Sequence, residues 1–300
     1  MSETTNTYLQ RINLVLDFVR AHLTEDLSLA TLARVAGFSP FYFHRLFKGL
    51  TGETVNDCVN RLRLERAAAL LRGSTISITE AALACGFDTS SGFSRAFKRR
   101  YGLTARSWDR QSPLKESKNG QVVEGLPRYT PAQLRQIARE RHLRVTIREL
   151  AEQRVAFIRV FDPFRRRGAI PAAYEHLTAW AKRNGIEPRE QTLFGMSHDD
   201  PEVTPLRLCR LDWALTVPVG AKAGGEVRLR TQPACRIAAI HICGDVTQEY
   251  LALQYLLLAW LPRSRYLPAN LPMMEIYHKQ PAELGWATYD MECALPITTL

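Results

Sequence analysis

Two short stretches of the sequence, fifty residues apart, place an arginine beside hydroxyl, imidazole or aromatic side chains at helical spacing. An arginine can pair bidentately with guanine, a serine hydroxyl can bond to several bases, and an aromatic ring can contact the thymine methyl group. The spacing therefore predicts contacts to base edges in the major groove of DNA. The candidates for these contacts are Phe41, Arg45, Ser91, Ser94 and Arg95.

A blander interpretation of these side chains stays open, because arginine also binds phosphate groups or pairs with a nearby carboxylate. Three further basic residues, Lys48, Lys98 and Arg99, lie near the ends of the two stretches. We expect them to contact DNA phosphates, and a solvated helix face is the alternative.

The second stretch lies in a segment with the pattern of a helix-turn-helix. Ser77 and Glu80 have the spacing of a capping box, which begins a helix. Gly86 supplies a tight turn, and a second helix is predicted from Ser90 to Tyr101. Phenylalanines recur in that helix at i and i+4 and should pack inward, which leaves the polar side chains on its outer face.

The first stretch belongs to a second copy of this pattern. Gly37 lies 49 residues before Gly86, and the run Phe43 to Lys48 lies 50 residues before Phe93 to Lys98. Matches at a nearly fixed offset indicate an internal duplication.

A continuous helix is predicted between the two copies, from Thr54 to Leu71. Such a helix spans roughly 25 to 30 Å, close to the ~34 Å between successive major-groove faces. One chain could therefore place two recognition helices on one duplex. A monomer is sufficient for this, and the oligomeric state stays open.

Charge is unevenly distributed along the 300 residues, which suffice for about two domains. The net charge is +10; residues 1 to 112 hold 15 Lys and Arg against 10 Asp and Glu, and residues 113 to 150 hold 8 against 4. Residues 151 to 300 are nearly balanced, with 17 against 16. A polyanion should therefore dock on the first half of the chain.

Several classes of site and location are disfavoured by the sequence. The six cysteines form no C-x-x-C pair, so we expect neither a metal site nor a disulfide framework, and no cofactor. No N-terminal signal or membrane-spanning apolar run is present, so we expect a cytoplasmic protein without a membrane partner.

The second half of the chain changes to alternating apolar patterns typical of strands. The segment Arg154 to Arg159 is echoed by Arg236 to His241 at an offset of 82, and two further echoes have offsets of 80 and 78. We predict two strand-helix-strand-strand units related by a pseudo-twofold axis, with a groove between them. The expected domains are an all-α domain over 1–112, a linker and short helix over 113–142, and an α+β domain over 143–300.

The first half resembles the DNA-binding domain of the AraC/XylS family of bacterial transcription regulators. The resemblance rests on the A-x-x-x-G-F turns at Ala33 to Phe38 and Ala82 to Phe87, the two F-x-R-x-F-K helices, and Gly102-Leu103-Thr104. It implies base contacts by the residues already named from their chemistry, and it adds His44 to them. It also implies promoter DNA and RNA polymerase as partners.

The second half resembles the GyrI-like effector-binding domain, through its duplication, the run Met274 to Pro281 and the closing Asp290 to Ile297. A similar order of domains occurs in the right-origin-binding protein subgroup of stress regulators. The resemblance implies a drug or small-molecule effector and places Glu275 at the floor of a pocket.

A carboxylate among aromatic rings attracts a flat cation through charge and through the ring faces. The residues expected to line such a pocket with Glu275 are Tyr277, Tyr289, Trp213, Phe194, Tyr174 and Trp180, with Glu292 as a weaker candidate. The alternatives are that Glu275 lies on the solvent-exposed side of its strand and that the tryptophans only pack in the hydrophobic core.

Taken together, these features predict a ligand-responsive, sequence-specific transcription activator of stress or efflux genes, which is not an enzyme. One alternative is a GyrI-like hydrolase that uses Glu275 or Glu292 beside Tyr289. The other is a regulator whose second domain binds a protein partner.

Overall fold

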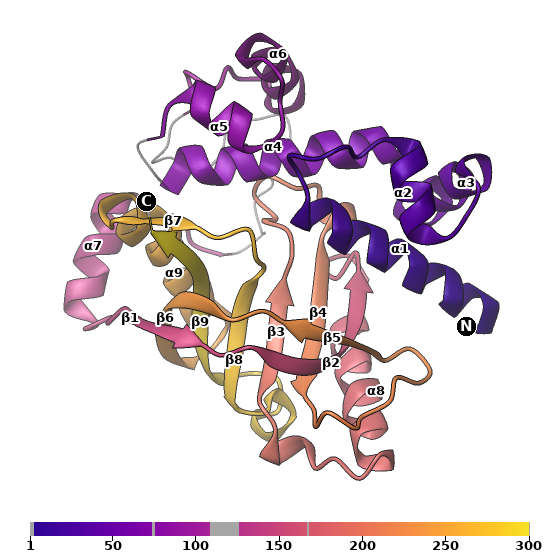
Figure 1. Ribbon diagram of the computed structural model, residues 1–300. Coiled ribbons are helices and arrows are strands. Elements are labelled where there is room, and N and C mark those ends of the chain that lie inside the picture. Colours follow the sequence, from indigo (N-terminus) through magenta and orange to yellow (C-terminus); the bar gives the residue numbers. More distant parts are fainter. Residues whose placement is uncertain (1–2, 74–75, 109–125, 167, 300) are drawn as a thin grey trace. The chain divides into compact units, whose positions relative to one another are not determined.

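The computed structural model describes residues 3–73, 76–108, 126–166 and 168–299. The chain divides into two compact units, the first built mainly from residues up to Trp108 and the second mainly from residues 120 to 300 (Figure 1). Residues 113–125 of the predicted linker lie outside the described residues. No helix of the described residues is long and apolar enough to cross a membrane.

The first unit is all-α, as predicted. Its helices are α1 (Glu3–Ala21), α2 (Leu29–Ala36), α3 (Pro40–Thr51), α4 (Val55–Gly73), α5 (Ile78–Ala84) and α6 (Ser90–Tyr101). The capping box of Ser77 and Glu80 begins α5, and α3 and α6 both end at a glycine in the left-handed conformation.

The duplication is visible in the burial of side chains. Phe43 and Phe47 of α3 are buried, as are Phe93 and Phe97 of α6, at the same positions of the two helices. Their rings pack in pairs with centroids 5.6 Å and 5.4 Å apart. The shared core fixes which face of each helix remains outside.

Helix α4 connects the two copies and, with 19 residues, is about 28 Å long. In Figure 1 the α2–α3 pair lies at one end of α4 and the α5–α6 pair lies toward the other. Arg61 of α4 is buried and pairs with Glu53 and, at 3.2 Å, with Glu65. Arg100 of α6 pairs with Glu65 at 3.2 Å, so one carboxylate ties α6 to the connecting helix.

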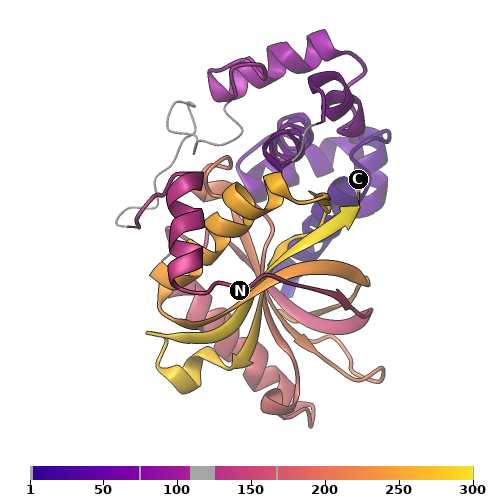
Figure 2. The same cartoon turned by 90° about the vertical axis from the view of Figure 1, so that its left-hand side faces the viewer.

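The second unit is a curled antiparallel sheet with helices on one of its faces (Figure 2). Its elements are α7 (Pro131–Glu140), β1 (Thr146–Leu150), β2 (Gln153–Phe161), α8 (Ala169–Arg183), β3 (Leu193–Ser197), β4 (Arg210–Thr216), β5 (Arg228–Gln232), β6 (Cys235–Gly244), α9 (Val246–Gln254), β7 (Tyr266–Pro268), β8 (Met273–Lys279) and β9 (Tyr289–Thr299). The short basic helix α7 packs on the end of α9, through Leu134 against Leu251 and Leu258.

The predicted duplication of strand-helix-strand-strand is confirmed as β2-α8-β3-β4 and β6-α9-β8-β9. The strand order is β1-β6-β9-β8-β3-β4-β2-β5. Strands at the same distance from the two ends of this order, such as β1 and β5 or β6 and β2, are equivalent strands of the two repeats. β5 lies 82 residues after β1 and has the same length. β1 pairs with β6 and β5 pairs with β2, so each repeat contributes its first strand to the other.

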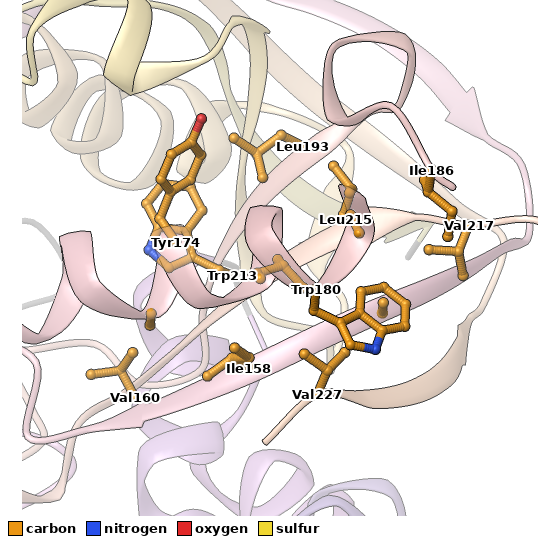
Figure 3. Close-up of a cluster of buried hydrophobic side chains, with 14 of the residues drawn as sticks. Ile158, Val160, Tyr174, Trp180, Ile186, Leu193, Trp213, Leu215, Val217 and Val227 are labelled. Atoms are coloured by element: carbon orange, nitrogen blue, oxygen red, sulfur yellow. The ribbon is translucent and has the colours of Figure 1, made fainter. Parts of the chain in front are cut away.

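Helices α8 and α9 cover the same sheet face on opposite sides of the pseudo-twofold axis. Tyr174 and Trp180 of α8 pack on β2 and β4 (Figure 3), in a cluster that also includes Leu177. Leu256, after α9, packs on β6 and β9. β3 and β8 pair between these clusters, with Gly195 opposite Glu275. The opposite face is lined by a separate apolar cluster.

Candidate functional site

The outer face of α3 carries three of the residues predicted to contact bases. Phe41 is 74 % exposed, far more than a phenylalanine in a core, and the Arg45 guanidinium lies 5.8 Å from its ring centroid. Arg45 is exposed and His44 is half-buried. An exposed aromatic ring beside an arginine can provide apolar and hydrogen-bonding contacts to adjacent bases.

Helix α6 presents the equivalent face. Arg95 and Ser91 are exposed, and Ser94 is half-buried. Positions 45 and 95 therefore share both residue type and environment. The structure brings each set of three predicted base-contacting residues onto one helix face.

The predicted phosphate-contacting residues Lys48, Lys98 and Arg99 are exposed in the last turns of α3 and α6. Their exposure is compatible with phosphate contacts and with a solvated helix face. In either case, cations at this end of a helix complement its dipole.

A tightly packed turn positions α6. Gly86 has φ +80°, and a Cβ there would lie 2.1 Å from the carbonyl oxygen of Leu23 and 3.0 Å from Arg63 Nε. Arg63 Nε donates a hydrogen bond to that carbonyl at 2.8 Å. Sequence reasoning missed Arg63, because its partner lies forty residues away in the chain.

The second candidate site is centred on Glu275, in the middle of β8. Glu275 lies opposite Gly195 of β3, where an added Cβ would lie 2.4 Å from Glu275 Oε2. The absence of a side chain at Gly195 therefore provides the space for the carboxylate. The two residues occupy equivalent positions of the repeats, 80 residues apart.

Glu275 has two polar partners. The Tyr277 hydroxyl donates a hydrogen bond to Glu275 Oε2 at 2.6 Å, and Glu249 of α9 forms a hydrogen bond with Glu275. Burial raises the pKa of Glu275, and burial followed by the charge of Glu275 raises the pKa of Glu249 well above its ordinary value. The pair thus retains a proton more readily than exposed glutamates do.

Aromatic rings continue from this carboxyl pair toward α8. Tyr277 lies 5.4 Å from Trp213 and 6.4 Å from Tyr289, and Tyr174 lies 5.6 Å from Trp213, between ring centroids. Trp286 packs edge-on against Tyr174 at 5.2 Å and has a positive φ of 62°. Carboxylates flanked by aromatic faces can bind a delocalised organic cation.

Three residues predicted for the pocket are not brought together with Glu275. Phe194 and Glu292 lie on the opposite sheet face, because Phe194 pairs with Ile276 and Ile276 pairs with Glu292, one position away from Glu275. Glu292 instead pairs with Arg148. Trp180 packs toward Val217 and Val227, away from the Tyr174 and Trp213 rings (Figure 3).

Sequence reasoning missed Glu249, Trp286 and Gln280 at this site. Gln280 accepts a hydrogen bond from the Tyr174 hydroxyl and donates one to the Pro188 carbonyl at 2.6 Å, which fixes Tyr174. Glu249 carried no signal beyond an acidic residue in a first helical turn, and only the packing of α9 on the sheet makes it a partner of Glu275.

A buried ionic cluster lies on the opposite face of the sheet. Asp212 accepts hydrogen bonds from Arg159 at 2.7 and 2.9 Å and contacts Arg230 and His198. Burial lowers the pKa of His198 to about 4, although Asp212 favours its charged form. The cluster joins β2, β4 and β5, and we assign it a structural role.

Comparison with known families assigns both units. A helix-turn-helix domain model matches residues 32–111, and a model of the GyrI-like small molecule binding domain matches residues 144–298, more than half of the chain. The chain belongs to the AraC-type transcriptional regulators with a C-terminal GyrI-like domain. Its helical unit is thus a DNA-binding domain, and its second unit is a small-molecule binding domain.

Curated relatives match this AraC-type regulator over about a third of its length. The probable transcriptional regulator LumQ of Photobacterium leiognathi is 36 % identical over 98 residues, 32 % of this chain and 40 % of LumQ. The transcriptional regulator Rob of Salmonella typhimurium is 34 % identical over 98 residues, 33 % of this chain and 34 % of Rob. The match thus spans two fifths or less of each of these relatives.

Solved structures match parts of the regulator. The DNA-binding domain of AdpA in complex with a target DNA is 30 % identical, with a TM-score of 0.32, over 32 % of this chain and 87 % of that chain. The EcmrR C-terminal domain is 17 % identical, with a TM-score of 0.42, over 53 % of this chain and 99 % of that chain.

Proposed function

We propose that this regulator binds promoter DNA with α3 and α6 in adjacent major grooves, and that its GyrI-like domain senses a cationic or amphipathic molecule at Glu275. The observation that carries the proposal is the repeated exposed face of the two helices, with an arginine at the same position of each. Charge supports it as well, since the first 150 residues hold the excess of Lys and Arg.

The carboxyl pair supports a cationic effector. Glu249 and Glu275 share a hydrogen bond in a partly buried site, where two negative charges would repel each other. A cation bound beside them would replace the shared proton as the neutralising charge. The neighbouring rings of Tyr277, Tyr289 and Trp213 would favour a flat, apolar cation.

Activation of transcription through RNA polymerase is the proposed outcome of binding. The relative RhaS of Escherichia coli, 34 % identical over 106 residues, is an HTH-type transcriptional activator. We extend this role to the present regulator on the strength of the shared DNA-binding domain alone.

DNA binding is tested by selecting genomic fragments with the purified full chain and measuring their affinity. Loss of an arginine that reads guanine should cost about 1 to 3 kcal/mol on the selected fragment and little on unrelated DNA. Arg45→Ala and Arg95→Ala should both show this selective loss. Lys98→Ala, as a phosphate-contact control, should weaken binding to all sequences alike. Absence of any selected fragment would contradict the proposal.

Effector binding is tested separately, by titrating tetraphenylphosphonium against tryptophan fluorescence. Trp213 lies beside Tyr277 and should report occupancy. We expect Glu275→Gln to weaken binding at least about tenfold, or 1.4 kcal/mol. Glu292→Gln, on the other sheet face, serves as the matched control. Equal affinities for the parent and Glu275→Gln would remove the carboxylate from the site, and turnover of an ester probe would favour a hydrolase instead.

A further inference from the structure

Metal-ligating side chains converge at one corner of the GyrI-like domain, outside the site of Glu275. His241 and Cys243 are alternate residues of β6 and so lie on the same sheet face. Asp290 of β9 is the direct register partner of Cys243. Their face is the one opposite Glu275, because Glu292, the register partner of His241, lies on that face too.

The three ligand atoms have nearly the spacing of a tetrahedral site. Cys243 Sγ lies 3.7 Å from His241 Nε2 and 3.7 Å from Asp290 Oδ1. With Zn–S near 2.3 Å and Zn–N or Zn–O near 2.0 Å, tetrahedral angles place sulfur about 3.5 Å from nitrogen or oxygen. His241 Nε2 and Asp290 Oδ1 are 2.9 Å apart and would separate by about 0.4 Å around an ion.

A second imidazole lies near these three residues, outside the 4.8 Å within which their own ligand atoms lie of one another. His278 of β8 is exposed, and its ring centroid lies 5.0 Å from that of His241. A register shift between Tyr277 and Lys279 places His278 at a bulge of the β8–β9 pair. Bulges redirect a side chain relative to its neighbours, which is a frequent means of aiming residues at a site.

We propose that His241, Cys243, His278 and Asp290 form a binding site for a four-coordinate transition-metal ion of the Zn²⁺ class. Two imidazoles, a thiolate and a carboxylate are ligands that Zn²⁺ accepts in tetrahedral geometry. The chemistry of this donor set excludes Mg²⁺ and Ca²⁺, which take oxygen ligands. The proposal departs from the expectation of no metal site, which rested on sequence spacing within single segments.

Lys279 is the cationic partner of Asp290 that a bound metal ion would replace. Its Nζ lies 3.7 Å from Asp290 Oδ2, and its side chain is 59 % exposed. A lysine that is this exposed can swing into solvent at little cost, because exposed ion pairs contribute little. Metal binding would therefore displace Lys279 from Asp290.

The bound ion would join the ends of β6, β8 and β9. β8 carries Glu275 and Tyr277 on its other face, and His278 follows Tyr277 directly. Occupancy would therefore restrain the strand that presents the effector site and would raise the stability of the domain by mass action.

The test uses the full chain without an affinity tag, with Co²⁺ as the spectroscopic probe and Zn²⁺ in competition with a chromophoric chelator. We expect visible bands of four-coordinate cobalt, a thiolate-to-cobalt charge-transfer band, and a rise in the unfolding temperature with Zn²⁺. Cys243→Ser should abolish the charge-transfer band. It should also weaken Zn²⁺ binding by more than the roughly 10- to 100-fold that loss of an outer-shell partner typically costs.

Matched variants separate this site from adventitious binding. Cys235→Ser, at the other end of β6, should bind both ions like the parent, and Lys279→Ala should bind at least as tightly. His278→Gln should weaken binding and change the cobalt bands. Binding that is insensitive to Cys243→Ser, or a charge-transfer band that disappears with Cys235→Ser, would overturn the proposal.

Discussion

Gly195 and Glu275 face each other across the paired strands β3 and β8, at equivalent positions of the two repeats. One repeat supplies a carboxylate and the other supplies the space for it, because a Cβ at Gly195 would lie 2.4 Å from Glu275 Oε2. The pseudo-twofold arrangement thus produces an asymmetric site, with one acidic side chain in the middle of a symmetric sheet.

This relationship predicts the effect of Gly195→Ala. The added methyl group must displace Glu275 from its hydrogen bonds to Tyr277 and Glu249, so we expect the affinity for tetraphenylphosphonium to fall at least about tenfold, or 1.4 kcal/mol. Gly220→Ala is the control, since a Cβ there meets nothing within 4 Å. Unchanged affinity in Gly195→Ala, measured by fluorescence titration, would show that the carboxylate does not act from this position.

Effector affinity should depend on pH. The pKa values of Glu249 and Glu275 are raised in the folded state, so the pair must release a proton when a cation binds. The affinity for the cation should therefore increase as the pH rises above 4.5, the ordinary pKa of a glutamate. The pair's contribution to stability has the opposite trend, since it is complete below 4.5 and is lost as pH rises through the folded pKa values.

The measurement is a series of titrations with tetraphenylphosphonium between about pH 5 and 8, above the ordinary carboxyl pKa of 4.5. Glu249→Gln removes one of the two coupled carboxyls and should flatten the dependence in this range. A parent affinity that is independent of pH would argue against proton exchange at the pair.

A second pH dependence should come from His198. Its pKa is lowered to about 4, so it is neutral in the folded state while it ionises near 6.5 in the unfolded state. The unfolded state therefore binds more protons between these values, and stability should decrease as pH falls from about 6.5 to 4, by at most about 3 kcal/mol. Urea unfolding monitored for the GyrI-like domain checks this. Stability that increases on acidification through this interval would contradict it.

The DNA-binding unit should not tolerate Gly86→Ala. The residue has φ +80°, and a Cβ would lie 2.1 Å from the Leu23 carbonyl, so we expect a loss of at least about 2 kcal/mol in the free energy of unfolding. Gly49→Ala, in the interior of α3 with nothing within 4 Å, should be neutral or stabilising by about 0.5 to 1 kcal/mol. Thermal unfolding of both variants distinguishes strain at Gly86 from a general effect of alanine.

Local features of the fold could be predicted from the sequence. The capping box of Ser77 and Glu80 and the phenylalanine spacing of residues 90–101 are decided within one helical turn or two, and both appear in the structure as expected. The duplication within the second unit could also be predicted. The 82 residues that separate Arg154 from Arg236 in the sequence equal the separation of β2 and β6 in the structure.

Features that depend on distant pairing could not be predicted in this way. The exchange of β1 and β5 between repeats is a choice of partner, which periodicity does not encode. The placement of Phe194 depends on strand register, where a shift of one residue changes the face. Glu249 reaches Glu275 only because α9 packs on the sheet. These three features follow from tertiary packing.

The most direct test of the account measures the affinity of a selected promoter fragment with and without tetraphenylphosphonium, in the parent and in Glu275→Gln. The concentration is chosen to occupy the site of the parent and to leave that of Glu275→Gln largely empty. By thermodynamic linkage, if the effector changes the affinity of the protein for DNA, then DNA changes the affinity of the protein for the effector by the same factor. We predict that the cation changes the DNA dissociation constant of the parent at least about fivefold and leaves that of Glu275→Gln unchanged. An equal change in both proteins, or no change in either, would contradict the claim that Glu275 senses the signal that controls DNA binding.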